Sequence, residues 1–265
     1  MKEKTRPGVT IITSTIRPAF IKRIFENYAR QKWENKQLII VLNKDSVSIK
    51  PYRKLAQKYS NVQVVRQPQG KNLGACLNYA ASLAQHPYIA KFDDDDYYAP
   101  SYIPEAMALF KKSKADIVGK RSCYFYFPHR SLLLHRKTPV RPYNRCRKIA
   151  GATIMFHKRV FKRVKFVTNV RQGSDVRFVA ASLRKGFRVF TTSSYNFVAF
   201  RRANRQSHTW KISDKQLIGR RNGSIIRTKN FMKHVNRSLD QLKGIRGYHS
   251  GKLPAKQDDR LRYGV

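Results

Sequence analysis

The chain has 265 residues and carries 56 Lys and Arg against 15 Asp and Glu, a formal net charge of +41. Its 41% hydrophobic and 12% aromatic residues suffice for a buried core and exclude a wholly disordered chain, and no apolar run reaches the roughly 18 residues of a membrane-spanning helix. The charge predicts attraction to polyanions such as nucleic acid, anionic lipid or an acidic substrate, without choosing among them.

The cysteines and the N-terminal residues bear on the cellular compartment. Cys76, Cys123 and Cys146 are odd in number and widely spaced, which fits neither a disulfide framework nor a zinc knuckle. The stretch MKEKTRPGVTIITST contains no long apolar segment of the kind found in secretory signals. We therefore expect a cytoplasmic protein, whose charge would suit the inner face of an anionic membrane.

Apolar, β-branched segments alternate with segments of helical spacing through residue 119. The predicted strands are 8–15, 37–43, 61–67, 88–92 and 115–119. The predicted helices are one that begins near Pro18, 52–60 and 101–113, and residues 70–85 predict a glycine-containing loop that runs into a helix. This alternation predicts an α/β fold with a mostly parallel, Rossmann-like central sheet flanked by helices, in which ligands bind at the carboxyl ends of the strands.

The alternation is interrupted at residues 120–150. These residues are aromatic and basic and contain Pro, with no clean period, and they predict a small β-rich excursion over the sheet. Residues 173–192 then predict a helix capped by Ser174 or Asp175, which ends at Gly186 and leads into a strand.

The C-terminal part of the chain differs in composition from the rest. From residue 200 onward it is polar, with 17 Lys and Arg against 4 acidic residues. We therefore expect one α/β domain over 1–210, followed by a basic C-terminal extension over 211–265 that is partly helical or loosely ordered.

Asp93 to Asp96 stand together directly after the predicted strand 88–92 and make up 4 of the 15 acidic residues. Adjacent carboxylates repel one another, so a positive charge is needed to compensate them. Mg²⁺ and Mn²⁺ prefer carboxylate oxygens and bridge them to substrate phosphates, which makes this strand end a candidate metal–diphosphate site. In an extended backbone Asp93 and Asp95 would face one way and Asp94 and Asp96 the other. The alternative is a solvated acidic turn in which Asp96 caps the following helix.

Several separated segments resemble the glycosyltransferases of family 2, bacterial enzymes with the GT-A fold. The segment YIAKFDDDDYYAP (88–100) looks like the family's Asp-x-Asp motif, in which an apolar strand ends on carboxylates followed by aromatic residues and Pro. The other similar segments, in chain order, are VTIITSTIRP, LIIVLNKDS, GKNLGACLNYA, AGATIMFHKRVFKRVKF, GSDVRFVAASLRKGFRVF and SHTW. Each motif alone is weak, whereas their shared order over most of the chain is a strong signal.

The resemblance implies roles for residues of a donor site. Asp95 would coordinate a divalent metal, Mn²⁺ or Mg²⁺, and His208 would complete the metal site or contact the diphosphate. The implied nucleotide-binding residues are Thr13, Thr15, Arg17, Asn43, Asp45, Lys71, Asp93 and Asp94. The segment NKDS (43–46) departs from the family's usual Asp-Asp-Gly-Ser, so whether Asn43 or Asp45 contacts the base stays open.

Asp175 would be the general base for the acceptor hydroxyl, although Ser174 replaces the Glu that the family carries before it. From the pattern alone, Asp175 could be only a helix cap and His208 only a surface residue. The implied activity is inverting transfer of a sugar from a nucleotide diphosphate donor, expected to be a UDP-sugar, to a hydroxyl of a glycan or lipid-linked acceptor in polysaccharide synthesis. The positive charge adds the expectation of an acidic acceptor or an anionic membrane surface.

Two other classes of protein fit part of the sequence. A polyanion- or nucleic-acid-binding basic protein would explain the charge and the interleaved aromatic residues. No helix-turn-helix, zinc or RNP pattern supports it, and it leaves the aspartates unexplained, so nucleic acid is not the expected partner. A metal-dependent nucleotidyltransferase or hydrolase would use the aspartates but not the later Gly-Ser-Asp and His-Thr-Trp segments.

Overall fold

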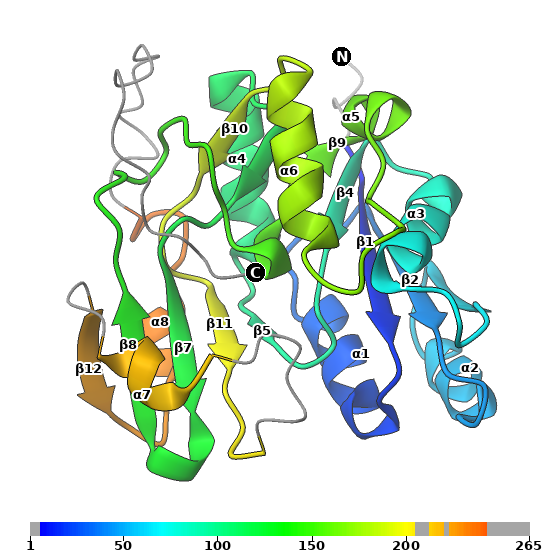
Figure 1. The fold of residues 1–265 in the computed structure, drawn as a ribbon, viewed down its shortest axis with the longest axis horizontal. Coiled ribbons are helices and arrows are strands. Elements are labelled where there is room, and N and C mark those ends of the chain that lie inside the picture. Colours follow the sequence, from blue (N-terminus) through cyan, green and yellow to red (C-terminus); the bar gives the residue numbers. More distant parts are fainter. Residues whose placement is uncertain (1–5, 205–211, 220–222, 243–265) are drawn as a thin grey trace.

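The computed structural model describes residues 6–204, 212–219 and 223–242, which contain two β-sheets (Figure 1). The larger sheet has the strand order β10-β6-β9-β4-β1-β2-β3. Its strands are Val9–Thr15 (β1), Lys36–Leu42 (β2), Val62–Arg66 (β3), Tyr88–Lys91 (β4), Ile117–Gly119 (β6), Met155–His157 (β9) and Val189–Thr191 (β10). Neighbouring strands are parallel except at β9, which is antiparallel to both β4 and β6. This mostly parallel sheet confirms the predicted α/β fold.

Helices cover both faces of the larger sheet (Figure 1). They are Ile21–Ala29 (α1), Lys50–Ala56 (α2), Leu73–Leu83 (α3), Tyr102–Ser113 (α4), Lys158–Arg163 (α5) and Ser174–Arg184 (α6). Successive residues of β1 point to opposite faces, so Ile11 packs in one core cluster with α1, α2 and α4, and Ile12 in a second cluster with α3, α5 and α6. Within the described ranges, no helix combines the length and apolar character needed to cross a membrane.

Local signals in the sequence set the ends of several helices. Pro18 begins a 3₁₀ turn (Pro18–Phe20, η1) that leads directly into α1. The Asn72 side chain caps α3 by accepting a hydrogen bond from the Ala75 amide at 3.0 Å. Gly186 follows α6 with a φ of +85°, a backbone conformation that glycine adopts without steric cost.

The smaller sheet contains the predicted β-rich excursion and has the strand order β12-β8-β7-β11-β5. Its strands are Tyr97–Tyr98 (β5), Cys123–Phe127 (β7), Leu132–Arg136 (β8), Phe197–Phe200 (β11) and Gly223–Arg227 (β12). A 3₁₀ turn, Pro128–Arg130 (η2), connects β7 to β8.

The C-terminal residues that the structure describes join the smaller sheet. β12 pairs antiparallel with β8, and the helices Asp214–Ile218 (α7) and Met232–Val235 (α8) each contribute a buried side chain to a core cluster. These elements belong to the expected C-terminal extension. The expected domain boundary at residue 210 lies outside the described residues.

A buried ion pair joins the two sheets. Glu105 of α4 and Lys120, which follows β6, are 0% and 1% exposed, and Lys120 Nζ lies 3.3 Å from Glu105 Oε2. Glu105 also accepts hydrogen bonds from the Ser193 amide at 2.8 Å and from the Asn196 side chain at 3.3 Å, in the segment that leads into β11. Because a buried charge is costly without its partner, this network holds the connection between the sheets in one arrangement.

Replacing Glu105 by Ala should leave the Lys120 ammonium buried without its carboxylate and lower the free energy of unfolding by about 3–5 kcal/mol. The double variant Glu105→Leu/Lys120→Met removes both charges and should lose less than this single variant. Urea unfolding followed by circular dichroism measures both. Equal losses in the single and double variants would contradict a role for the ion pair.

Candidate active site

The four aspartates lie at the carboxyl end of β4, beside the carboxyl end of its parallel neighbour β1. Asp94 is 3% exposed, and its Oδ2 accepts hydrogen bonds from Thr15 Oγ1 at 2.6 Å and Arg17 Nε at 3.1 Å. A second guanidinium nitrogen of Arg17 contacts Oδ1, so the guanidinium holds both carboxylate oxygens. Thr13 is buried within β1. The contacts of Asp94 with Thr15 and Arg17 hold the loop after β1 against the aspartate run.

Asp95 faces the same cation as Asp94. Its Oδ2 lies 3.0 Å from Arg17 Nη1 and 2.8 Å from Arg202 Nη1. The expectation that Asp94 and Asp95 face opposite ways is therefore wrong, because residues 94 and 95 form a turn instead of continuing the strand. The turn directs both carboxylates toward one guanidinium.

Three arginines surround the ring of Phe20 next to this turn. The guanidinium carbons of Arg17, Arg202 and Arg23 lie 4.8, 5.0 and 5.5 Å from the ring centroid. Arg23 Nη1 also donates to the Asp95 carbonyl at 2.5 Å. Sequence reasoning missed Arg23 and Arg202, because nothing distinguishes them among 56 cationic residues.

Asp93 pairs with a lysine of its own strand. Lys91 Nζ lies 2.5 Å from Asp93 Oδ1 and 3.7 Å from Asp175 Oδ2, and the lysine side chain is 1% exposed. It also donates to the Gly151 carbonyl at 3.2 Å, in the 3₁₀ turn Gly151–Thr153 (η3). The structure thus brings Asp175 and the aspartate run together on either side of one ammonium group. A lysine inside the apolar run YIAKF was the available signal for it.

Asp96 bonds to a strand of the smaller sheet. It is 7% exposed, and its Oδ1 accepts a hydrogen bond from the Phe200 amide of β11 at 3.0 Å. Its carbonyl accepts a second bond from Asn27 Nδ2 of α1 at 2.9 Å. The alternative in which Asp96 caps the following helix is wrong, since α4 begins after Ser101.

Burial and charge act differently on these carboxyl groups. Burial raises the pKa of Asp94 and of Asp96, and at Asp96 the nearby Asp95 and Asp93 raise it further. Burial also raises the pKa of Asp95, but Arg17 and Arg202 outweigh this effect and the net result is a lowered pKa. Asp95 is therefore the carboxylate of the run whose charge is best stabilised at neutral pH.

Three more predicted residues lie in the loops that follow β2 and β3. Asn43 donates to the Pro68 carbonyl at 2.6 Å, and the exposed Asp45 accepts from the Gln69 amide at 3.4 Å. Lys71 is exposed just before α3. Because β2 and β3 are parallel to β1, these loops share the sheet edge at which β1 ends.

A divalent metal would have Asp95 as its protein ligand. In the part of the chain that the structure describes, no three His, Cys, Asp or Glu side chains gather to hold a metal, and His208 lies outside that part. Mg²⁺ and Mn²⁺ commonly bind one or two carboxylates and complete their coordination with substrate phosphates. The ionised Asp95 fits such an ion, provided that Arg17 and Arg202 move from it to the phosphates.

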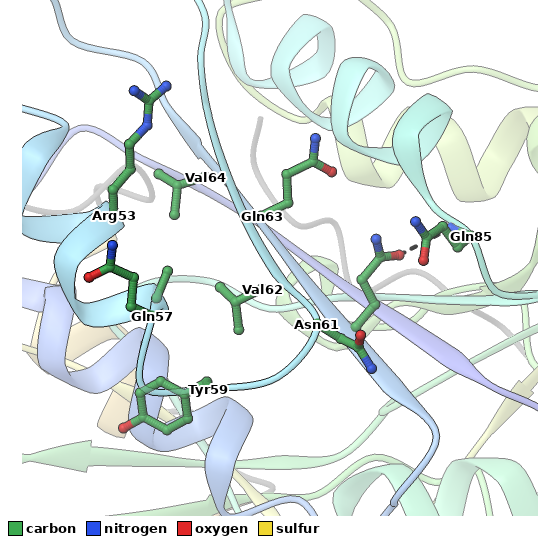
Figure 2. A pocket seen from close by; sticks show the side chains of 10 residues that line it. Arg53, Gln57, Tyr59, Asn61, Val62, Gln63, Val64 and Gln85 are labelled. Carbon is green, nitrogen blue, oxygen red and sulfur yellow. Dashed lines mark hydrogen bonds between the residues drawn. The ribbon is translucent and has the colours of Figure 1, made fainter.

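A separate hollow lies at the opposite end of the sheet (Figure 2). Its polar lining residues are Gln37, Arg53, Gln57, Tyr59, Asn61, Gln63 and Gln85. Gln37 and Asn61 stand where β2 and β3 begin, and the Gln85 amide donates to Gln37 Oε1 at 3.1 Å. None of the predicted site residues lines this hollow, so it is distinct from the edge that carries the aspartates.

The sequence model of glycosyl transferase family 2 matches residues 10–168, more than half of the chain. The matched residues include β1 from its second residue onward, the aspartate run and η3. The chain belongs to glycosyl transferase family 2. This membership confirms the predicted family and, at the level of the family, the predicted glycosyltransferase class.

Solved structures of two proteins share the fold. Residues 1–349 of TarS from S. aureus, in complex with UDP-GlcNAc, match with a TM-score of 0.58 at 14% identity, over 74% of this chain and 59% of that one. PcManGT, a mannosyltransferase from Pyrobaculum calidifontis in complex with GDP-Man and Mn²⁺, matches with a TM-score of 0.55 at 17% identity, over 75% and 57%. The chain thus spans less than two thirds of the length of either protein. No curated protein sequence matches it.

Replacing Arg17 by Met should remove the cation shared by Asp94 and Asp95 and destabilise the fold at neutral pH. The lowered pKa of Asp95 means that its ion pairs stabilise the native state above the unfolded-state pKa of about 3.9, and this contribution is lost as the pH falls through the native value. The urea midpoints of wild type and Arg17→Met should therefore differ most near neutral pH and converge in acid. The exposed Arg53→Met is the control, and a pH-independent difference for Arg17→Met would contradict the assignment.

Proposed function

We propose that this chain transfers a sugar from a nucleotide diphosphate donor to an acceptor hydroxyl, with inversion at the anomeric carbon. The observation that carries the proposal is the Asp95 carboxylate, which Arg17 and Arg202 contact at 3.0 and 2.8 Å at the carboxyl ends of the strands in a family 2 chain. Two proteins of the same fold were solved with such donors, UDP-GlcNAc in one and GDP-Man in the other. A UDP-sugar is the donor proposed first, and a GDP-sugar is the alternative.

The cations of the site suit the leaving group. As the sugar–phosphate bond breaks, the nucleotide diphosphate gains negative charge. Arg17 and Arg202 are placed to turn from Asp95 to its phosphates, because guanidinium groups form bidentate, charge-assisted hydrogen bonds with phosphate oxygens. A divalent metal on Asp95, Mn²⁺ or Mg²⁺, would supply Lewis-acid stabilisation of the same charge.

The loops at this edge supply the proposed nucleotide contacts. Asp93 would lie beside the ribose. Asp94, predicted as a nucleotide contact, is 3% exposed and bonded to Thr15 and Arg17, so its part would be to hold the Arg17 loop against the sheet. The loops after β2 and β3 would carry the contacts to the base and the phosphates. Their candidate residues are Asn43, Asp45 and Lys71.

Asp175 is the proposed general base. Its side chain is 21% exposed at the start of α6, so it is open to an acceptor on one side while its Oδ2 faces Lys91 on the other. A carboxylate that takes the proton from the attacking hydroxyl typically contributes a factor of about 10²–10⁴ to the rate. Attack from the face opposite the diphosphate gives the inverted product.

Calorimetric titration of UDP tests the donor site. Wild type should bind UDP in the presence of Mn²⁺, and both EDTA and the Asp95→Ala variant should weaken this binding at least about tenfold, because EDTA removes the metal that would attract the diphosphate and the variant removes the carboxylate that would hold it. Asp240→Ala removes an exposed carboxylate of the C-terminal segment and serves as the matched control. If wild type binds neither UDP nor GDP, the nucleotide site is refuted.

We further propose that the excess positive charge serves an acidic glycan or lipid-linked acceptor, or an anionic membrane surface. Residues 158–190, which include α5 and α6, contain ten Lys and Arg but only one acid, Asp175. The exposed cations of this segment are Arg159, Lys162, Arg163, Lys165, Arg171, Arg177, Arg184 and Lys185. They form a surface that attracts phosphate or carboxylate groups.

Sedimentation with vesicles tests this second proposal. The protein should pellet with vesicles that contain phosphatidylglycerol and stay in solution with neutral phosphatidylcholine, and added salt should release it. The charge-reversal variant Lys162→Glu/Arg163→Glu should bind less, while Glu26→Gln is the control on α1. No binding to the anionic vesicles, together with equal use of neutral and acidic acceptors, would overturn the proposal. Stronger binding to single-stranded DNA than to vesicles would favour a nucleic acid partner instead.

A further inference from the structure

Lys91 places a full positive charge in the interior at the end of β4. Its side chain is 1% exposed, and Nζ contacts oxygens from three separate parts of the chain: Asp93 Oδ1 at 2.5 Å, the Gly151 carbonyl at 3.2 Å and Asp175 Oδ2 at 3.7 Å. Burial alone lowers the pKa of a lysine, but Asp93 and Asp175 outweigh it, and the net pKa of Lys91 is raised. The ammonium therefore stays charged and keeps both carboxylates beside it.

Gly151 allows Asp175 to approach this ammonium. A Cβ at position 151 would overlap the Asp175 carboxylate, with Oδ2 as its nearest atom. A side chain there would displace the carboxylate, which is the end of a short, movable side chain, and would leave the surrounding backbone in place. Ser174, which precedes Asp175 in the chain, is 3% exposed and donates to the Val167 carbonyl at 2.8 Å, so its hydroxyl does not bond to the Asp175 carboxylate. The Val176 amide donates to Asp175 Oδ1 at 2.8 Å, while Lys91 faces Oδ2 and Gly151 leaves room for it, so these three groups together define the position of the carboxylate.

We propose that Lys91 is a positioning residue that holds the Asp175 carboxylate, through a shared ammonium, at a fixed distance from Asp93. The proposal rests on the function proposed above, in which Asp175 accepts the proton and Asp93 lies beside the donor. The Lys91 ammonium then connects Asp175, which would face the acceptor, with Asp93, which would face the donor. Because a reacting group displaced by about 1 Å can slow a reaction about 10²-fold, loss of this link should reduce turnover.

The two contacts of Lys91 predict different consequences for different variants. Gly151→Ala disturbs Asp175 but leaves Asp93 with its ammonium, so nucleotide release from UDP-GlcNAc should slow at least about tenfold while UDP affinity stays unchanged. Lys91→Met deprives both carboxylates of their partner, so turnover and UDP affinity should both fall. Lys91→Arg keeps a cation in place and should recover part of both.

Two controls separate positioning from general damage to the fold. Lys120 is also 1% exposed and also paired with a carboxylate, Glu105, but it contacts neither Asp93 nor Asp175. Lys120→Met should therefore lower the urea midpoint, while the affinity of the folded protein for UDP stays as in wild type. Arg53→Met changes an exposed side chain of α2 that lines the separate hollow, away from the aspartates, and should behave as wild type. Wild-type turnover in both Gly151→Ala and Lys91→Met would overturn the proposal.

A stability cycle tests the link without any turnover. Because Lys91 is shared, the urea midpoints of Lys91→Met, Asp175→Asn and the double variant should be non-additive, with the double variant losing less than the sum of the single losses. Additive losses would overturn the shared ammonium even in an active enzyme. If wild type binds no nucleotide and releases none, the proposed function fails, and this cycle still decides whether Lys91 holds Asp175.

Discussion

Four adjacent carboxylates repel one another, and a different part of the chain offsets each of them. Asp93 pairs with a lysine of its own strand β4, and Asp94 with the loop after β1. Asp95 contacts Arg17 of the same loop and also Arg202, which follows β11. Asp96 accepts a hydrogen bond from a backbone amide of β11. The repulsion within one turn is thus relieved by drawing together the end of the larger sheet and a strand of the smaller one. The candidate site lies where these contacts bring the carboxyl ends of β1 and β4 next to β11.

The four aspartates, which look identical in the sequence, have different surroundings and different roles in the structure. Asp94 and Asp96 are buried and anchor neighbouring elements, and burial favours their neutral forms. Asp95 lies among guanidinium groups that favour its ionised form. The positive groups near Asp95 are arginines, which exchange readily between carboxylate and phosphate partners of similar shape. The charge of Asp95 is thus balanced by Arg17 and Arg202 from two separate segments of the chain.

The sequence was informative wherever a pattern repeats along the chain, and uninformative wherever partners come from distant segments. The strand at 8–15 follows from its β-branched run and the strand at 88–92 from its apolar run, and a parallel sheet follows from the alternation of strands with helices. The facing of Asp94 and Asp95 was predicted wrongly because strand geometry was extended into residues that turn. Arg202 was not predictable, since its contact with Asp95 depends on where β11 ends in space. Lys91 was visible as a lone cation in an apolar run, and Asp175 was predicted as a site residue, but nothing in the sequence indicates that the two pair.

The position of β9 has a consequence for how the chain reaches its fold. This strand comes late in the sequence, yet it lies between β4 and β6 and pairs antiparallel with both. Until residues 155–157 have left the ribosome, the larger sheet exists only as separate pieces with open hydrogen-bonding edges. Such edges can pair with other chains, and closing them requires contacts between residues far apart in sequence, which form slowly. Synthesis of η3 and β9 is therefore the step at which the sheet can first close and the aspartate run gains its support from Gly151.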